Sequence, residues 1–133
     1  MTIKKLQKIL KEHSIKNWKV KIAPYFERVK DGAILVGGYT AFDHKTIFLT
    51  EDILEKNADE IITKLFLHEV AHVIVGKKAK HNYQFRKVAK QIGGYPNHTL
   101  AKEVQVVTKQ ELLEKQEEVL GSQIWNLLVG KNR

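Results

Sequence analysis

The sequence predicts a single α+β domain in which a small antiparallel or mixed three-stranded sheet packs on a central helix with flanking helices. Two observations support this fold class. Three short segments rich in β-branched and aromatic residues lie before residue 50, and an almost wholly apolar stretch of helical length follows at 61–75. The chain has 133 residues, which suits one domain with a sizeable core.

The first part of the chain is expected to form one helix and then three strands. Residues 3–13 carry apolar side chains at helical spacing and lysines on the other face. Residues 18–22 alternate apolar side chains with lysine, which predicts a half-buried strand that Pro24 ends. Residues 33–39 are the second expected strand, and residues 46–49 return as the third after a turn.

Polar residues predict where the next helices begin. Thr50 is expected to cap a short helix, with Glu51 and Asp52 in its first turn. Asn57 and Glu60 are spaced as a capping box for the apolar helix that follows. These acidic residues therefore have a structural explanation.

Two histidines and a glutamate interrupt the apolar stretch 61–75. His68 and His72 are four residues apart with Glu69 between them. A helix turns about 100° per residue, so both imidazoles share one face and can reach one metal ion. Burying such groups costs roughly several kcal/mol unless a partner takes up their lone pairs. A zinc ion is such a partner, and Glu69 beside it is the candidate general base.

Catalytic zinc usually has three protein ligands, so a third one is expected. The metzincin spacing is excluded because Val75 and Lys78 occupy the positions that it requires for Gly and His. Gly76 ends the first helix, and a second helix is expected over 81–92 after a short connection. His81 heads the face of that helix that packs back on the first, which makes it the candidate third ligand.

Alternatives to this assignment stay open. His81 could instead be a solvent-facing residue at a helix start, and Glu103 could be a carboxylate ligand of the gluzincin type. His98 lies in a turn-like stretch, whereas His13 and His44 fall at an expected helix end and hairpin turn. These last three histidines are expected to face solvent.

The pattern of these residues resembles the SprT-like metallopeptidase domain, over roughly residues 15 to 100. The likeness rests on Gly37-Gly38-Tyr39, His68-Glu69-Val70-Ala71-His72, His81, Phe85 and Gly93-Gly94. The resemblance implies a minimal zincin fold, one Zn²⁺ per chain held by the three histidines, and Glu69 as the base. It also implies proteolysis, which in several relatives is directed at proteins on DNA.

The resemblance adds two expectations about the cleft. In zincins the strand before the active-site helix often lies along the cleft edge, where it can pair with an extended substrate. By that analogy residues 46–49 are expected at the sheet edge, with an ordinary edge as the alternative. The residue that stabilises the oxyanion besides zinc stays open among Tyr39, Tyr83 and Tyr95.

The absence of cysteine separates this chain from many SprT-like proteins, which carry a cysteine zinc ribbon. DNA recognition by a ribbon is therefore not expected. Disulfides and metal–thiolate sites are excluded too, which suits an intracellular protein, cytoplasmic or associated with the nucleoid or nucleus. No apolar run of signal-peptide length begins the chain, and no segment approaches the ~20 apolar residues of a membrane span. We expect a non-secreted protein without membrane contact.

The net charge of +8 is unevenly distributed along the chain. Residues 1–21 hold seven lysines against Glu12 alone. Residues 77–90 hold six basic residues and no acid, namely Lys77, Lys78, Lys80, Arg86, Lys87 and Lys90. Both stretches predict contact with nucleic-acid phosphates, and the second flanks His81. A basic solvated surface is the alternative.

Three classes of function are compatible with these residues. A zinc endopeptidase acting on a protein or peptide is favoured, because a purely structural site needs no base such as Glu69. A nucleic-acid-binding protein with a structural zinc site is disfavoured by the missing cysteine. A non-catalytic interaction module would use the last expected helix, at about 110–128, which follows a short strand or helix start at 104–107. Substrate identity and oligomeric state stay open.

Overall fold

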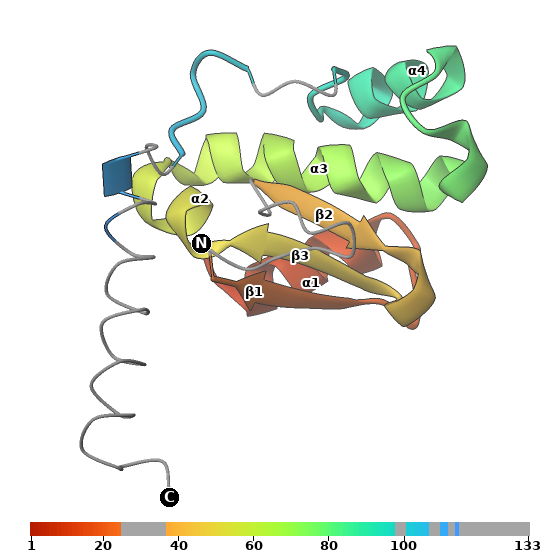
Figure 1. Cartoon of the computed structure of the whole chain (residues 1–133). Helices are drawn as coiled ribbons and strands as arrows, with labels where there is room; N and C mark the ends of the chain where they lie inside the picture. Colours follow the sequence, from red (N-terminus) through yellow and green to blue (C-terminus); the bar gives the residue numbers. More distant parts are fainter. Residues whose placement is uncertain (25–36, 98–100, 107–109, 112–113, 115–133) are drawn as a thin grey trace, which may run out of the picture.

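The computed structural model describes residues 1–24, 37–97, 101–106, 110–111 and 114. The elements are α1 (Ile3–Glu12), β1 (Lys19–Ala23), β2 (Gly38–Ala41), η1 (Phe42–His44), β3 (Thr46–Thr50), α2 (Glu51–Lys56), α3 (Asp59–Val75), η2 (Lys77–Ala79) and α4 (Tyr83–Ile92). The predicted α+β class is confirmed, with the small sheet on one side of α3 and α4 on another (Figure 1).

The sheet is mixed and has the strand order β1-β3-β2. β1 runs parallel to β3, with Val20 opposite Ile47, whereas β2 runs antiparallel to β3, with Thr40 opposite the same residue. The expectation that residues 46–49 form the sheet edge is therefore wrong. Both sides of β3 are already hydrogen-bonded, so β2 is the strand at the edge nearer to the polar residues of α3.

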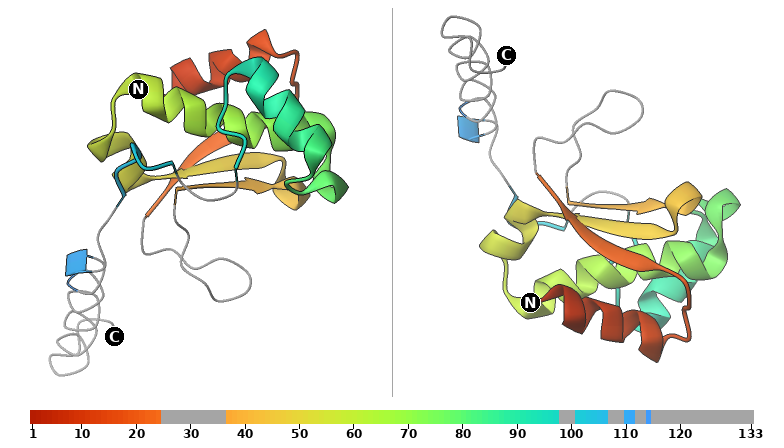
Figure 2. Two further views of the ribbon diagram at one scale, coloured as in Figure 1. Left: turned by 90° about the horizontal axis from the view of Figure 1, so that it is seen from above. Right: turned by 90° about the horizontal axis from the view of Figure 1, so that it is seen from below.

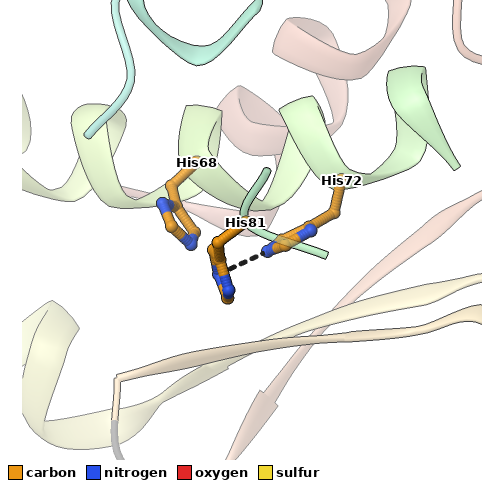
Figure 3. Close-up of side chains that lie close together, drawn as sticks. All are labelled: His68, His72 and His81. Atoms are coloured by element: carbon orange, nitrogen blue, oxygen red, sulfur yellow. Dashed lines mark hydrogen bonds between the residues drawn. The ribbon is translucent and has the colours of Figure 1, made fainter. Parts of the chain in front are cut away.

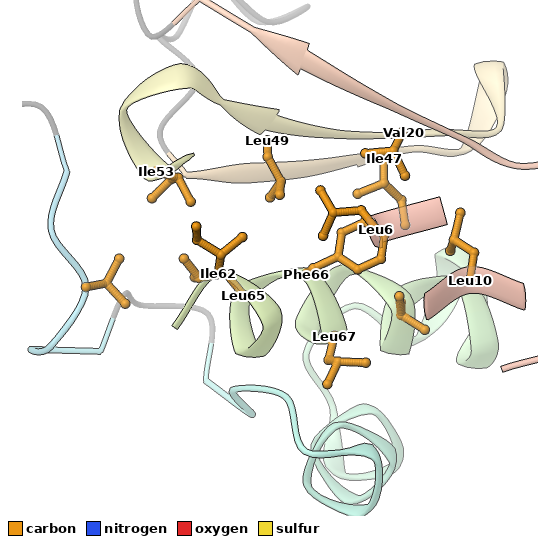
Figure 4. Packing of buried hydrophobic residues seen from close by; sticks show 12 residues of the cluster. Leu6, Leu10, Val20, Ile47, Leu49, Ile53, Ile62, Leu65, Phe66 and Leu67 are labelled. Atoms are coloured by element: carbon orange, nitrogen blue, oxygen red, sulfur yellow. The ribbon is translucent and has the colours of Figure 1, made fainter. Parts of the chain in front are cut away.

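The core lies between the inner face of this sheet and two helices, α1 and α3. Figure 4 shows Ile47 and Leu49 of β3 directed toward Phe66 of α3 and Leu6 of α1. All four side chains are fully buried, and the two views in Figure 2 show α1 running alongside α3. The predicted stripe on α1 is confirmed at Leu6 and Leu10 but not at Ile3, which is 40% exposed.

Strand β1 departs in part from the predicted alternation. Val20 is buried and its lysine neighbours are exposed, as the pattern predicts. Ile22, however, is 40% exposed, while Ala23 is buried. The inner face of β1 is thus covered by α1 at Val20 and not at Ile22.

The observed helix caps agree with the predicted ones only in part. Thr50 occupies the N-cap position of α2, but its hydroxyl donates to the carbonyl of Gly37 at 3.2 Å instead of accepting from the helix. The capping box at Asn57 and Glu60 is wrong, because Ala58 is the N-cap of α3 and makes no side-chain cap bond. Asn57 ends α2 instead, and its amide donates to the carbonyls of Ile53 at 3.0 Å and of Gln105 at 2.7 Å.

Helix α4 begins at Tyr83, two residues later than the predicted 81–92 range. The reason is Asn82, whose side-chain oxygen accepts from the backbone N–H of Phe85 at 3.0 Å and so caps the helix. Phe85 and Ala89 are buried against α3, which confirms the predicted packing face.

Several predictions fall on or beyond the limits of the described residues. Most of the expected strand at 33–39, His98 and nearly all of the last helix at 110–128 lie outside them. Residues 104–106 are described and form neither a strand nor a helix start, so that prediction is wrong there. No described helix is long and apolar enough to cross a membrane.

Candidate metal centre

The structure brings the three histidines predicted as zinc ligands together. One ring nitrogen each from His68, His72 and His81 lies within 4.8 Å of the others. The Nε2 atoms of His72 and His81 are 3.1 Å apart. Figure 3 shows two rings descending from successive turns of α3 and meeting the third from the segment before α4. Among the described residues this is the one group of His, Cys, Asp or Glu with such spacing.

His68 is oriented by a backbone carbonyl that no motif revealed. Its Nδ1–H donates to the carbonyl of Tyr95 at 2.6 Å, which leaves the Nε2 lone pair for another partner. Gly94 allows this approach, because a Cβ there would lie 2.7 Å from the backbone N of His68 and from the backbone C of Leu67. Figure 1 shows the segment after α4 returning along α3.

His81 is presented by a tight turn. The N–H of Asn82 donates to the carbonyl of Ala79 at 3.1 Å, which places Lys80 and His81 at the two central positions of the turn. The guanidinium of Arg86 donates to the carbonyl of His81 at 2.8 Å and holds the turn against α4. Arg86, predicted to contact phosphates, is thus engaged within the protein.

Phe85 forms an apolar support beneath all three imidazoles. Its ring stacks on His72 with centroids 4.2 Å apart, and it meets His68 and His81 edge-on at 5.0 Å each. Because Phe85 is fully buried, its ring closes one side of the histidine cluster. The sequence pattern predicts this residue on the packing face of α4 but does not reveal its contact with the histidines.

The donor set suits a zinc ion. Burial lowers the pKa of His72 to about 4, with the positive charges of His68 and His81 as lesser causes. Its imidazole is therefore neutral at pH 7 and offers a lone pair, as metal ligation requires. Three imidazole nitrogen donors are a common catalytic zinc set, whereas Mg²⁺ and Ca²⁺ prefer oxygen.

Glu69 lies on the same helix but is held by the sheet. Its carboxylate Oε1 accepts from the hydroxyl of Thr40 at 2.8 Å, and its backbone carbonyl accepts from the same hydroxyl at 3.3 Å. Burial raises the pKa of Glu69 to about 7, and the Thr40 bond opposes this in part. Gly38 keeps the strand close, since a Cβ there would lie 3.2 Å from Oε2. A carboxyl group with this pKa can exchange a proton at neutral pH.

The histidines and Glu69 share a cavity of about 590 Å³. Its walls come from β2 and η1, α3, η2 with the turn after it, and the segments that follow α4. The lining residues are Gly38, Tyr39, Thr40, Phe42, Leu65, His68, Glu69, His72, Lys77, Lys80, His81, Tyr95, Asn97 and Ala101. Tyr39 and Tyr95 are thus candidates to contact a substrate, whereas Tyr83 is 73% exposed and lies outside the lining.

The alternative ligands lie elsewhere. Glu103 accepts a hydrogen bond from the hydroxyl of Tyr95 and lies 3.8 Å from the ammonium of Lys64, so its carboxylate is used away from the histidines. Burial and then Glu103 raise the pKa of Tyr95. His13 is partly buried, so the expectation that it faces solvent is wrong; its Nδ1 atom lies 3.1 Å from the carbonyl of Ile9. His44 is exposed at the end of η1, as predicted.

The sequence model of the SprT-like family matches residues 3–110 of this chain. The chain belongs to the SprT-like family. The match spans the whole candidate centre and extends the resemblance back to α1. No curated protein and no solved structure matched this SprT-like chain.

Proposed function

We propose that this SprT-like protein is a zinc-dependent endopeptidase. The observation that carries the proposal is the placement of Glu69, a buried carboxyl group, in the same cavity as three clustered imidazoles. Apolar packing does not explain a glutamate at this position of α3, because burying a carboxyl group costs free energy. A general base beside a metal explains why it is there.

The chain's own residues supply the rest of the chemistry. Zinc, when bound by the three histidines, lowers the pKa of water to about 7 and polarises a carbonyl group. Glu69 Oε takes up a proton from the attacking water and delivers it to the leaving amine. Thr40 keeps Oε1 in place during both transfers, and its hydroxyl favours the carboxylate form of Glu69.

The geometry favours a catalytic site over a structural one. Structural zinc sites are closed by four protein ligands. Within the part of the chain that the structure describes, the cluster has three histidines and opens on the cavity. The interaction-module alternative depends on the last predicted helix, which lies almost wholly outside the described residues.

Metal analysis combined with a protease assay tests the proposal. We expect about one zinc per chain and cleavage of an unfolded protein that stops when a chelator is added. Glu69→Gln should retain the zinc and the fold but lose cleavage, because an amide cannot accept the proton. Cleavage by the zinc-loaded Glu69→Gln variant at the wild-type rate would show that the base is another group.

The substrate class is the finer part of the proposal, namely proteins bound to DNA. The net charge supports it, and so do Lys78, Lys87 and Lys90, which are exposed and lie outside the cavity lining. Lys77 contributes less, because its ammonium lies 3.9 Å from Asp43. The basic stretch at 77–90 is thus divided between internal contacts and a solvent-facing surface.

Charge reversal at Lys78, Lys87 and Lys90 tests this part. We expect weaker DNA binding with zinc retained, and a salt dependence whose slope falls by about one unit for each phosphate that the variant no longer neutralises. The comparison variant reverses Lys4, Lys8 and Lys11 on α1, which are also exposed and belong to the other basic stretch. Equal effects of the two triple variants would mean that the 77–90 stretch is not the preferred DNA surface.

A further inference from the structure

Two lysines stand at the mouth of the cavity, next to the candidate metal centre. Lys77 and Lys80 line it together with His81, and among the described lining residues Glu69 is the one acid. Glu69 is buried and held by Thr40, whereas both lysines are exposed. The exposed charged residues that line the cavity are therefore positive, whereas its acid is buried.

Lys80 has a backbone conformation that disfavours any side chain. Its φ of 50° and ψ of −125° match the first central position of a type II′ turn, which the Asn82-to-Ala79 hydrogen bond closes. Glycine is the residue expected at that position, because a Cβ is strained there. Lysine thus occupies a place where the fold alone would favour glycine.

The fold does not account for the Lys80 side chain. The side chain is exposed, and its ammonium makes no ion pair with a carboxylate in the part of the chain that the structure describes. Lys77, in contrast, is 3.9 Å from Asp43. Lys80 therefore carries the positive charge at the mouth of the cavity that no described carboxylate pairs with.

We propose that Lys80 is a specificity-determining residue that selects substrates with an acidic side chain close to the scissile bond. A carboxylate entering the cavity would lie near the ammonium of Lys80, and the opposite charges would attract each other. A lysine side chain in that position of the substrate would be repelled. This inference rests on the proposed peptidase function, since it names the peptide that the same cavity accepts.

Peptide binding to an inactive variant tests this inference independently of catalytic activity. The probe is a pair of fluorescent peptides with blocked ends that differ only in Glu or Gln beside the cleavage site, and the protein is the zinc-loaded Glu69→Gln chain. We expect the Glu peptide to bind about fivefold more tightly at low salt, a ratio in the range of a partly exposed ion pair. The ratio should approach one as salt is raised. A third peptide with Gln and a free carboxyl end tests whether a terminal carboxylate is accepted as well.

Three substitutions at position 80 assign the effect to the side-chain charge. Lys80→Gln and Lys80→Gly should abolish the Glu-to-Gln ratio, whereas Lys80→Arg should keep it. Lys80→Gly should not lower the thermal unfolding midpoint, because the turn favours glycine. The matched control is Lys45→Gln, since Lys45 is also an exposed lysine with positive φ, at 47°, but lies outside the cavity lining.

The outcomes distinguish this inference from the proposed function. A ratio near one in the Glu69→Gln chain, or an unchanged ratio in Lys80→Gln, overturns the role of Lys80 while cleavage by the wild-type protein can still be observed. A Lys80-dependent ratio without any cleavage by the wild-type protein supports the acidic subsite and overturns the peptidase. If Lys80→Gln weakens binding of an oligonucleotide and leaves the peptide ratio intact, the lysine serves nucleic acid and the inference is wrong.

Discussion

At the scale of single residues, the candidate centre depends on partners that lie far away in the sequence. His68 is oriented by the carbonyl of Tyr95, and Glu69 by the hydroxyl of Thr40. The histidines and Glu69 could be predicted because their spacing on a helix has chemical meaning. Their partners could not, because a carbonyl group has no side-chain identity and Thr40 is an ordinary strand residue.

The Thr40 hydroxyl should tune the general base. Thr40→Val keeps the shape and removes the donor, so the pKa of Glu69 should rise further and the carboxylate form should need a higher pH. We expect the acidic limb of the pH profile of kcat/KM to move upward, with kcat lower at pH 7. Thr40→Ser restores a donor and should return the limb toward the wild-type position. An unmoved limb in Thr40→Val would remove Thr40 from this role.

Burial of Glu69 should contribute a fall in the stability of the zinc-free protein as pH rises. Below pH 4.5 the carboxyl group is protonated in both states. Between pH 4.5 and about 7 the unfolded chain releases a proton that the folded chain keeps, so the contribution of Glu69 to the free energy of unfolding falls with pH. Glu69→Gln removes this fall, which is at most about 1.4 kcal/mol per pH unit. The lowered pKa of His72 acts in the opposite direction and is the same in the wild type and in Glu69→Gln. Urea unfolding of both zinc-free proteins at pH 5 and pH 8 measures the difference, and parallel changes would contradict the expected burial.

At the scale of elements, sequence patterns predict which helices and strands exist better than they predict which elements lie side by side. Alternation identifies β1, because period two reports which face of a strand is buried. The β-branched and aromatic residues after a turn locate β3. Alternation does not report which strand lies beside which, so the central place of β3 could not be predicted. The role of Asn57 could not be predicted for a related reason, since its amide bonds to Gln105, a residue 48 positions away.

The close approach of the segment after α4 to α3 should be sensitive to a single methyl group. Gly94→Ala would place a Cβ 2.7 Å from backbone atoms of α3, which must move the segment. We expect a decrease of about 1–3 kcal/mol in the free energy of unfolding and weaker zinc binding, because the carbonyl of Tyr95 shifts away from His68.

Gly93→Ala is the matched control for that substitution. Its φ of 90° makes alanine strained, but the nearest atom to an added Cβ is the Leu67 side chain at 3.8 Å. Stability should therefore fall while zinc affinity, measured by competition with a chromophoric chelator, stays near the wild-type value. An equal decrease of zinc affinity in both variants would mean that the close packing at Gly94 does not support His68.

At the scale of the whole molecule, the candidate centre lies where α4 packs on α3. The main core cluster holds α1, the sheet and α3, whereas Phe85 and Ala89 of α4 pack on Ala71 of α3 in a second small cluster. His81 precedes α4, and His68 and His72 belong to α3. A metal held by all three would therefore add a link between α3 and the turn before α4.

Zinc should consequently raise the stability of the whole protein, since a ligand that binds the folded state alone shifts the unfolding equilibrium. At a free zinc concentration about 100 times the Kd, the gain is about 2.7 kcal/mol, and thermal unfolding with and without a chelator measures it. His81→Ala should lose most of the zinc-dependent rise, because the two histidines of α3 alone lack the third protein ligand of a catalytic zinc site. Its zinc-free midpoint should stay close to that of the zinc-free wild type, since His81 is only partly buried. A full zinc-dependent rise in His81→Ala would show that the third ligand is another residue.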